Sequence, residues 1–358
     1  MNHCKRLLRG LALAAALAAA AFAAAAADDS LHGAGATFPA PVYARWAAIY
    51  KLGSGVDVRY DAIGSGTGIE RIERGQVDFG ASDVPLAPAE LRRIGVTQFP
   101  AVVGGVVPVI NIGGVGSGRL RLTGQVLGDI YLGKIKKWDH PAIAELNPGL
   151  NLPGTNITVV HRSDSSGTSF LWSSFLSRSN PEWKTRVGAA MRLDWPIGVA
   201  DVGNEGVASS VQRTKTSIGY VEYAYAKRHH LATVLVRNRD GAYVAPGHAS
   251  FAAAAAAARW HDASDLQQSL IDSAGAASWP ITGASFILLR TTADQPPRSL
   301  AVMKFFDWAF RRGKRDAVEL DFAALPDSAI EIIGRAWTEQ VRRADGGVVW
   351  PAADSLHP

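Results

Sequence analysis

The sequence predicts an α/β protein with largely parallel sheets, and two observations support this fold class. Segments whose apolar residues recur at helical spacing alternate with short apolar or alternating runs, which are typical of strands. The two kinds of segment are also interleaved along the chain and do not form separate blocks. Interleaving favours sheets that are flanked by helices.

The first three elements show the alternation. Residues 39–51 place Val42 and Trp46 one helical turn apart, residues 56–62 alternate as a strand does, and residues 68–75 return to helical character. Further strands are expected at 77–82, 99–112, 156–160, 217–223, 231–238 and 285–291, and further helices at 169–178, 251–260 and 299–313.

Residues 1–27 have the pattern of a cleaved secretory signal: three basic residues, an Ala/Leu-rich core and an Ala-x-Ala ending. The apolar run from Leu11 has 17 residues, mostly Ala, and is weak for a membrane span. We therefore expect export and cleavage near Ala27–Asp28. Cleavage would remove Cys4, the only cysteine, and with it any thiol chemistry.

The charge balance argues against a nucleic-acid partner. The leader holds three of the 37 Lys and Arg residues and none of the 32 Asp and Glu, so the remaining 331 residues carry 34 basic against 32 acidic groups. They contain neither a basic stripe with interleaved aromatics nor a long charge run. Nothing after the leader is apolar for long enough to cross a membrane.

The length after the leader suffices for two domains with separate cores. The Gly-rich segments around 102–114 and 274–282 are the expected crossings between them. Two crossings make the first domain discontinuous. We predict a signal peptide at 1–27, a first lobe at 28–105 with 280–358, and a second lobe at 106–279.

Three segments share one design, in which a strand runs into a Gly/Ser/Thr turn that opens a helix. A helix N-terminus offers unpaired N–H groups and the positive end of the helix dipole, which suit an anion. One such turn is simply a capped helix, but three of them favour a converging oxyanion site. The turns contain Thr37 as expected N-cap, Ser65, and Ser166–Gly167–Thr168 beside Arg162.

Asp83 follows the apolar strand predicted at 77–82, and two interpretations are open. It could cap the next helix. Alternatively, it could accept the O–H of a protonated phosphate, whereas fully ionised sulfate would meet a repulsive carboxylate.

Three other motifs are rejected, so we expect neither a cofactor nor a metal. Residues 128–135 approach the nucleotide P-loop, but Ile135 replaces the Ser or Thr that binds magnesium. Residues 64–68 and 113–118 miss the dinucleotide spacing. His229–His230 lack companions at metal-ligand spacing.

A hydrolase triad of His161, Asp164 and Ser166 is also disfavoured. Ser166 has no G-x-S-x-G elbow around it. Triads are normally assembled from distant segments, whereas these residues span a single strand–turn junction. No catalytic residue is assigned.

Seven segments carry a resemblance to a known family: GAGATFPAPVYARW, IGSGTGIERI, VDFGASDVPL, LGDIYLGKIKKWDHPAIAELNPG, VVHRSDSSGTSF, IGYVEYAYA, and FFDWAF followed by LPDS. From about Leu31 to about Ala336 the chain resembles the periplasmic phosphate-binding proteins of the phosphate-specific (Pst-type) ABC importer. The resemblance implies a two-lobed, type II periplasmic-binding-protein fold. Each lobe is then a mainly parallel sheet flanked by helices, with the ligand cleft between the lobes.

The resemblance also implies a ligand set. Phosphate would be held by Thr37, the backbone N–H of Phe38, Ser65, Asp83, Arg162, Ser166, Gly167 and Thr168, with Asp164 orienting Arg162. Two departures are visible. Ser165 stands where the family commonly has glycine, and Gly66-Thr67 varies a Ser/Gly-rich turn.

The implied function is a monomeric periplasmic receptor for inorganic phosphate, without enzymatic activity. It would deliver phosphate to an inner-membrane ABC permease with cytoplasmic ATPase subunits. Two alternatives remain: a secreted phosphatase-like hydrolase on the same scaffold, and a receptor for another oxyanion such as sulfate or molybdate. Asp83 distinguishes a phosphate receptor from a receptor for sulfate or molybdate, because those two anions carry no proton at neutral pH.

Overall fold

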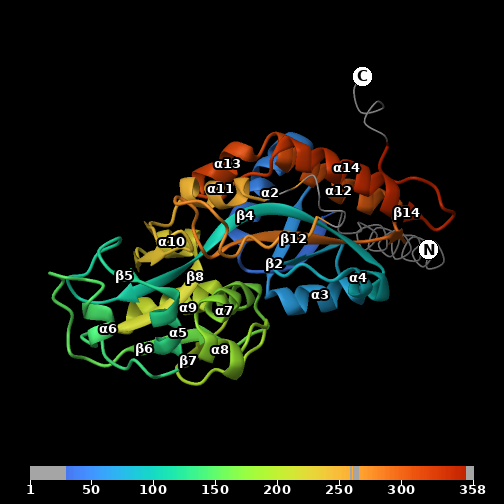
Figure 1. Cartoon of the computed structure of the whole chain (residues 1–358). Coiled ribbons are helices and arrows are strands. Elements are labelled where there is room, and N and C mark those ends of the chain that lie inside the picture. Colours follow the sequence, from blue (N-terminus) through green and yellow to red (C-terminus); the bar gives the residue numbers. More distant parts are fainter. Residues whose placement is uncertain (1–29, 259, 261–265, 352–358) are drawn as a thin grey trace, which may run out of the picture.

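The structure, a computed structural model, describes residues 30–258, 260 and 266–351 (Figure 1). The predicted signal peptide lies outside these residues. Within the described part of the chain, no helix is both long and apolar enough to cross a membrane.

One nine-stranded sheet runs through the molecule (Figure 1). Its strands, in spatial order, are β2 (Val58–Ala62), β1 (Leu31–Gly35), β3 (Phe79–Ser82), β12 (Thr282–Arg290), β4 (Val96–Asn111), β8 (Ser217–Glu222), β6 (Thr158–Arg162) and β7 (Val199–Asp201), while β9 (Ala232–Thr233) also pairs with β4. A small sheet contains β11 (Tyr243–Val244), β10 (Leu235–Arg237) and β5 (Arg121–Leu122), and a second joins β13 (Thr292–Ala293) to β14 (Arg342–Arg343).

Strand β4 is shared by two halves of this sheet. Its residues 96–105 pair with β12, and its residues 106–111 pair with β8. We call β2, β1, β3, β12 and 96–105 the first half, and 106–111, β8, β6 and β7 the second half.

The predicted parallel pairing is found in both halves. Strand β1 is parallel to β2 and β3, and β6 is parallel to β7 and β8. The three central pairings, β3–β12, β12–β4 and β4–β8, are antiparallel instead. A strand that is buried on both faces is a continuous apolar run whether its neighbours are parallel or antiparallel. The sequence pattern therefore did not reveal the antiparallel pairings.

Helices cover both halves of the sheet (Figure 1). Around the first half lie α2 (Ala40–Ser54), α3 (Ser65–Glu73), α4 (Pro88–Ile94), α12 (Pro296–Arg311), α13 (Lys314–Glu319) and α14 (Asp327–Gln340). Around the second half lie α5 (Gly124–Tyr131), α6 (Pro141–Ala144), α7 (Gly167–Ser179), α8 (Pro181–Arg186), α9 (Gly203–Arg213) and α10 (Tyr223–Arg228). Helix α11 (His248–Ala256) lies beside α13, and His248 Nδ1 is 3.0 Å from the Phe322 carbonyl oxygen.

Most predicted elements are present with shifted ends, and two differ in character. The strand expected at 231–238 is divided into β9 and β10, because β9 pairs with β4 and β10 with β5. The Ala-rich helix expected at 251–260 begins earlier, at His248, and it buries Phe251 and Ala254 in the core.

Each half has an aromatic core beneath the turns that follow its parallel strands. In the first half, Phe306 contacts Tyr43, Phe79 and Phe99 edge to face. In the second half, Trp172 stacks on Tyr220 with their ring planes 9° apart. Rigid packing of this kind fixes where the strands end, and therefore where the turns lie.

Candidate functional site

The predicted site residues lie in turns at the carboxyl ends of β1, β2, β3 and β6, and the turns of the two halves meet. A Cβ added to Gly167 would lie 2.5 Å from Ser65 Oγ and 2.6 Å from Asp83 Cβ. Only glycine fits such a gap. The two halves of the predicted set therefore face each other across this contact.

Thr37 is not the N-cap that the sequence predicted. Helix α2 begins at Ala40, and the capping position is occupied by Pro39 without a side-chain hydrogen bond. The Thr37 hydroxyl instead accepts a hydrogen bond from Asn204 Nδ2 at 2.8 Å, and the Thr37 carbonyl accepts one from Tyr225 Oη at 2.7 Å. Its side chain is thus turned toward the second half.

Asn204 is a site residue that sequence reasoning missed. It is fully buried, and its amide group also donates to Thr168 Oγ1 at 3.2 Å, while its Oδ1 accepts from the Glu222 N–H at 2.9 Å. The sequence did contain a signal for Asn204. Gly203–Asn204 begins α9 directly after β7, which repeats the strand–turn–helix design of the other three turns.

Phe38, whose backbone N–H group is a predicted ligand, has its ring in the core of the first half. The ring is fully buried and packs edge to face on Phe322, with centroids 6.0 Å apart. This packing holds the turn, so the backbone N–H group of Phe38 has a fixed direction.

The Ser65 turn packs directly on the Asp164–Ser165 turn. The Gly66 N–H group donates to the Ser165 carbonyl at 3.1 Å, and a Cβ added to Gly66 would lie 2.2 Å from Ser165 Oγ. Gly64 has φ of 97°, and a Cβ added there would lie 2.7 Å from Asp164 Oδ2. Ser65 Oγ itself accepts from the Asp83 N–H at 3.2 Å.

Asp83 is 1% exposed, and neither of its carboxylate oxygens has a hydrogen-bond partner among the described residues. Burial raises the pKa of this carboxyl to about 7, against the opposing effects of Ser285, Arg162 and Ser65. Asp83 does not cap a helix, since α4 begins at Pro88 after Ala87. A buried carboxylate without donors is an acceptor site for an O–H group.

Arg162 and Asp164 form a forked ion pair. Arg162 Nε donates to Asp164 Oδ1 at 2.6 Å, Nη2 donates to Oδ2, and buried Nη1 has no partner among the described residues. The Gly203 N–H group donates to Asp164 Oδ1 at 3.1 Å. Burial pushes the pKa of Asp164 upward, but the Arg162 fork and charge outweigh it and hold that pKa below its usual value.

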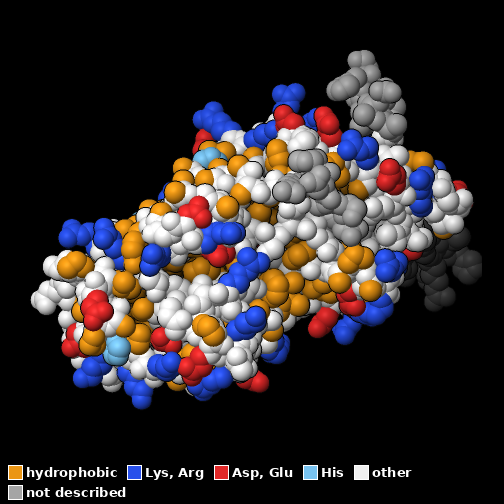
Figure 2. Space-filling view, in the orientation of Figure 1, with side chains coloured by type: hydrophobic (Ala, Val, Ile, Leu, Met, Phe, Trp, Pro, Cys, Tyr) orange, Lys and Arg blue, Asp and Glu red, His pale blue; other side chains and the backbone are white. Residues whose placement is uncertain are grey.

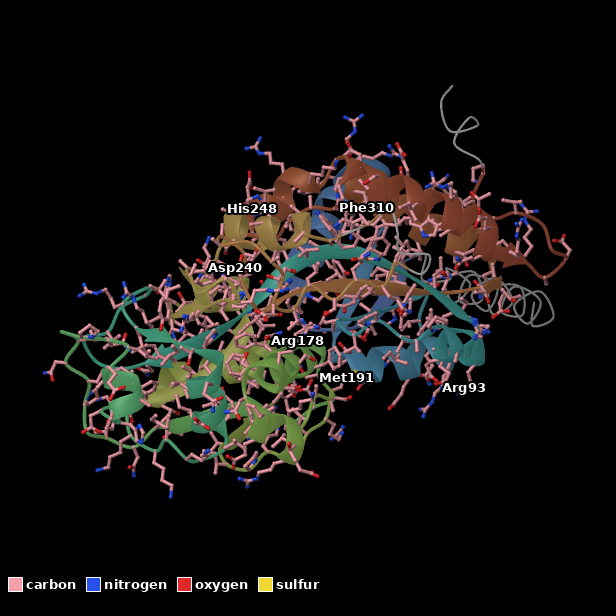
Figure 3. The ribbon with its side chains drawn as sticks, in the orientation of Figure 1. Arg93, Arg178, Met191, Asp240, His248 and Phe310 are labelled. Atoms are coloured by element: carbon pink, nitrogen blue, oxygen red, sulfur yellow. The ribbon has the colours of Figure 1, made fainter. Side chains whose placement is uncertain are left out.

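The start of α7 supplies further donors. Ser166 is the N-cap, and its Oγ accepts from the Ser169 N–H at 3.0 Å. Its own N–H donates to the carbonyl of Met191, a residue that Figure 3 labels. The N–H groups of Gly167 and Thr168, at the first helical positions, have no partner within the helix. They are available to an anion at the positive end of the helix dipole.

His161 does not join a catalytic triad in this structure. Its ring stacks on Trp195 with centroids 4.8 Å apart, and its Nδ1 lies 3.2 Å from the Arg162 carbonyl oxygen. Ser166 Oγ accepts the Ser169 N–H as the cap of α7 and makes no hydrogen bond with His161 in the described part of the chain.

The rejected motifs also have structural roles. Helix α5 ends at Tyr131, inside the stretch that resembles a P-loop, and Gly128 packs against Asn180. His229 Nε2 contacts Glu205 at 2.8 Å. Among the described residues there is no group of three or more His, Cys, Asp and Glu that could hold a metal ion.

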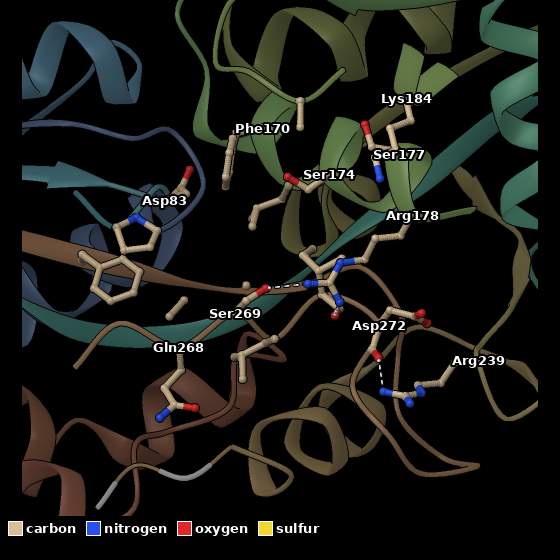
Figure 4. Close-up of a pocket in the computed structure, with 18 of the residues that line it drawn as sticks. Asp83, Phe170, Ser174, Ser177, Arg178, Lys184, Arg239, Gln268, Ser269 and Asp272 are labelled. Carbon is tan, nitrogen blue, oxygen red and sulfur yellow. Dashed lines mark hydrogen bonds between the residues drawn. The ribbon is translucent and has the colours of Figure 1, made fainter. Parts of the chain in front are cut away.

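A cavity of about 1150 Å³ lies between the two halves and reaches the Asp83 turn (Figures 2 and 4). Its walls carry Arg178, Lys184 and Arg239 against the carboxyls of Asp83 and Asp272. Arg178 Nη1 donates to the Ile271 carbonyl at 2.7 Å, and Arg239 Nη1 donates to the Asp272 carbonyl. Arg178 therefore stabilises the cavity wall and does not belong to the predicted ligand set around Arg162.

The chain matches a family model described as PBP superfamily domain over residues 20–312. It is 49% identical to the phosphate-binding protein PstS of Pasteurella multocida, covering 90% of this chain and 93% of that one. It is 46% identical to the phosphate-binding protein PstS of Haemophilus influenzae, covering 88% and 94%.

Solved structures share the fold at lower identity. A high affinity periplasmic phosphate-binding protein, PfluDING, bound with phosphate matches with a TM-score of 0.65 at 18% identity, covering 86% of this chain and 93% of that one. A phosphate binding protein from Stenotrophomonas maltophilia gives 0.64 at 19%, covering 90% and 97%. These likenesses confirm the predicted two-lobed α/β fold.

Proposed function

Since the chain belongs to the PstS family of phosphate-binding proteins, within the PBP superfamily, we propose that it captures inorganic phosphate and delivers it to an ABC importer. The relatives are named as binding proteins, so the chain is a solute-binding component and not an enzyme. A phosphatase-like reaction has no support from the His161 and Ser166 geometry.

The proposed phosphate ligands come from both halves of the sheet. They are Thr37, the Phe38 N–H, Ser65 and Asp83 from the first half, and Arg162, Ser166, Gly167 and Thr168 from the second, with Asp164 orienting Arg162. The free Nη1 of Arg162 and the N–H groups at the start of α7 support this assignment. Because Asp164 offsets much of the Arg162 charge, the site relies on dipoles more than on net positive charge.

The unpartnered carboxylate of Asp83 is the single observation that favours phosphate over other oxyanions. Its two unpartnered oxygens can accept the O–H of a protonated phosphate. Sulfate and molybdate carry no proton at neutral pH, so once Asp83 is ionised they would meet a buried, repulsive carboxylate.

Ligand binding is proposed to close two lobes, formed by 28–105 with 280–358 and by 106–279. The change of partner in β4 at residues 105 and 106 supports one crossing. The Trp279 indole donates to the Val106 carbonyl at 2.9 Å, which supports a second crossing beside the first. Contacts between Gly66 and Ser165 and between Thr37 and Asn204 join the two lobes.

The proposed setting is the periplasm, reached through a signal peptide cleaved near Ala27–Asp28. The proposed partner is an inner-membrane permease with cytoplasmic ATPase subunits, to which the receptor docks as a monomer. Both proposals follow from family membership.

Parallel calorimetry with phosphate and sulfate above neutral pH, where Asp83 is mostly ionised, tests the ligand assignment. We expect tight phosphate binding and rejection of sulfate, and equal affinities would contradict the role of Asp83. The Asp83→Asn variant should relax the rejection of sulfate more than it weakens phosphate binding. An unchanged affinity ratio in that variant would also count against this role.

A further inference from the structure

The peptide group that joins Thr37 to Phe38 belongs to the first half but is bonded to the second. Tyr225 Oη, on α10, donates to the Thr37 carbonyl oxygen at 2.7 Å. That oxygen also accepts from the Ala40 N–H group, but at 3.4 Å, so the phenol is its closer partner. A side chain of the second half therefore holds one end of this peptide group.

The other end of the peptide group is the N–H of Phe38. Phe38 is fully buried, and its N–H group makes no hydrogen bond to any described residue. Buried backbone N–H groups are nearly always paired with protein, water or ligand. The Thr37–Phe38 bond is trans, so its C=O and N–H groups point in opposite directions within one plane. The bond from Tyr225 thus also sets the direction of the Phe38 N–H group.

The phenol of Tyr225 is itself held in place. Tyr225 is 5% exposed, and the Arg228 guanidinium lies over its ring, 4.6 Å from the centroid. Arg228 is paired with Glu205 on α9. Burial raises the pKa of Tyr225 above its usual value, so the phenol keeps its one proton for the Thr37 carbonyl.

We propose that Tyr225 is a positioning residue for phosphate, which orients the Thr37–Phe38 peptide group from the opposite half so that the Phe38 N–H donates to the ligand. This inference rests on the proposed function, in which that N–H group is a ligand. A hydrogen bond accepted by the carbonyl also polarises the peptide group and strengthens its N–H as a donor. Tyr225 thus stabilises bound phosphate without touching it.

A simple tie between the two halves would also account for the Tyr225 bond, and the two roles differ in their effect on the site amides. Loss of a tie lowers affinity without singling out one amide. Loss of the positioning bond acts on the Phe38 amide in particular. The Gly167 amide is the internal reference, because it begins α7 in the same half as Tyr225.

Tyr60 offers a matched control variant. Its Oη, on β2 in the first half, donates to the Ala36 carbonyl at 2.7 Å, the same distance as in the Tyr225 bond. The N–H group of that peptide belongs to Thr37, which is proposed to bind phosphate through its hydroxyl. Tyr60→Phe therefore removes a phenol from the same turn but leaves the Thr37–Phe38 peptide group bonded to the second half.

The test measures the affinity for inorganic phosphate by calorimetry and the backbone amides by NMR at saturating phosphate. In Tyr225→Phe, we expect the affinity to fall about tenfold through the loss of one buried hydrogen bond. The Phe38 amide proton should move upfield, while that of Gly167 stays near its wild-type position. Tyr60→Phe should lower the affinity by less than about threefold and leave the Phe38 amide in place.

Unchanged phosphate affinity in Tyr225→Phe would overturn the positioning role. Equal shifts of the Phe38 and Gly167 amides would overturn it as well, and so would an equal Phe38 shift in Tyr60→Phe. A wild type that binds phosphate without any change at the Phe38 amide would remove Phe38 from the ligand set and this inference with it. Failure of the wild type to bind phosphate would instead refute the proposed function.

Discussion

The side-chain amide of Asn204 donates to the Thr37 hydroxyl at 2.8 Å and thereby links residues 167 positions apart in the sequence. The same amide donates to the Thr168 hydroxyl at 3.2 Å, so the two threonine hydroxyls both accept a hydrogen bond from one NH₂ group. The Glu222 N–H holds the amide in this orientation. Both threonine protons are then left to point toward an anion.

Replacing Asn204 should weaken phosphate binding in a defined order. Asn204→Ala removes two donors, which we expect to cost about tenfold in affinity. Asn204→Asp should cost more, because a carboxylate would accept both threonine protons and turn them away from the anion. Calorimetry measures both, with Asn180→Ala as control, since Asn180 is equally buried but caps α8. Equal affinities for the two Asn204 variants would contradict this orienting role.

The ligand-free protein should lose stability as pH rises from about 4 to about 7. Burial raises the pKa of folded Asp83 from 3.8 to about 7, so in this window the unfolded chain releases a proton that the folded chain retains. The shift corresponds to on the order of 4 kcal/mol in the free energy of unfolding, fully present below the unfolded pKa.

Urea unfolding of phosphate-free protein at several pH values measures this dependence. Asp83→Asn should flatten it, whereas groups common to both proteins, such as Glu222, cancel in the comparison. Parallel pH curves for the wild type and the variant would show that Asp83 titrates normally.

A serine at position 66 should be compatible with glycine, but not serine, at position 165. Gly66→Ser places a Cβ against the Ser165 side chain, which cannot move its own Cβ aside. We expect a loss of about tenfold or more in phosphate affinity, the effect of about 1–3 kcal/mol of overpacking. Gly66→Ser with Ser165→Gly should recover most of it.

The four proteins of this double-mutant cycle give the coupling between the two positions. An additive double variant would mean that the two turns do not meet in the phosphate-bound form.

Removing the charge at position 162 should weaken phosphate binding about a hundredfold, because a charge-assisted hydrogen bond is worth about 1.5–3 kcal/mol. Arg162→Met keeps much of the side-chain volume while removing the guanidinium group, whose free Nη1 is proposed to bind phosphate. Arg178→Met is the control, because Arg178 donates to the Ile271 carbonyl and, as Figure 4 shows, to the Ser269 hydroxyl in the cavity wall. Similar losses in both variants would argue for a general electrostatic effect.

Much of the candidate site could be predicted from the sequence because its residues contact near neighbours along the chain. Ser166 caps α7 through a residue three positions away, and Arg162 pairs with Asp164 two positions away. The prediction for Thr37 as a cap was wrong. Pro39 can begin a helix without a side-chain cap, so the cap signal did not decide where α2 starts.

The sequence by itself determined the alternation of strands and helices, the three small-residue turns, and the arginine with its orienting carboxylate. Each of these depends on neighbours within one helical turn or one strand. Only the tertiary structure decided that Asn204 orients Thr37 and that Gly66 meets Ser165. Those contacts depend on the packing of the two halves of the sheet against each other, which no local spacing encodes.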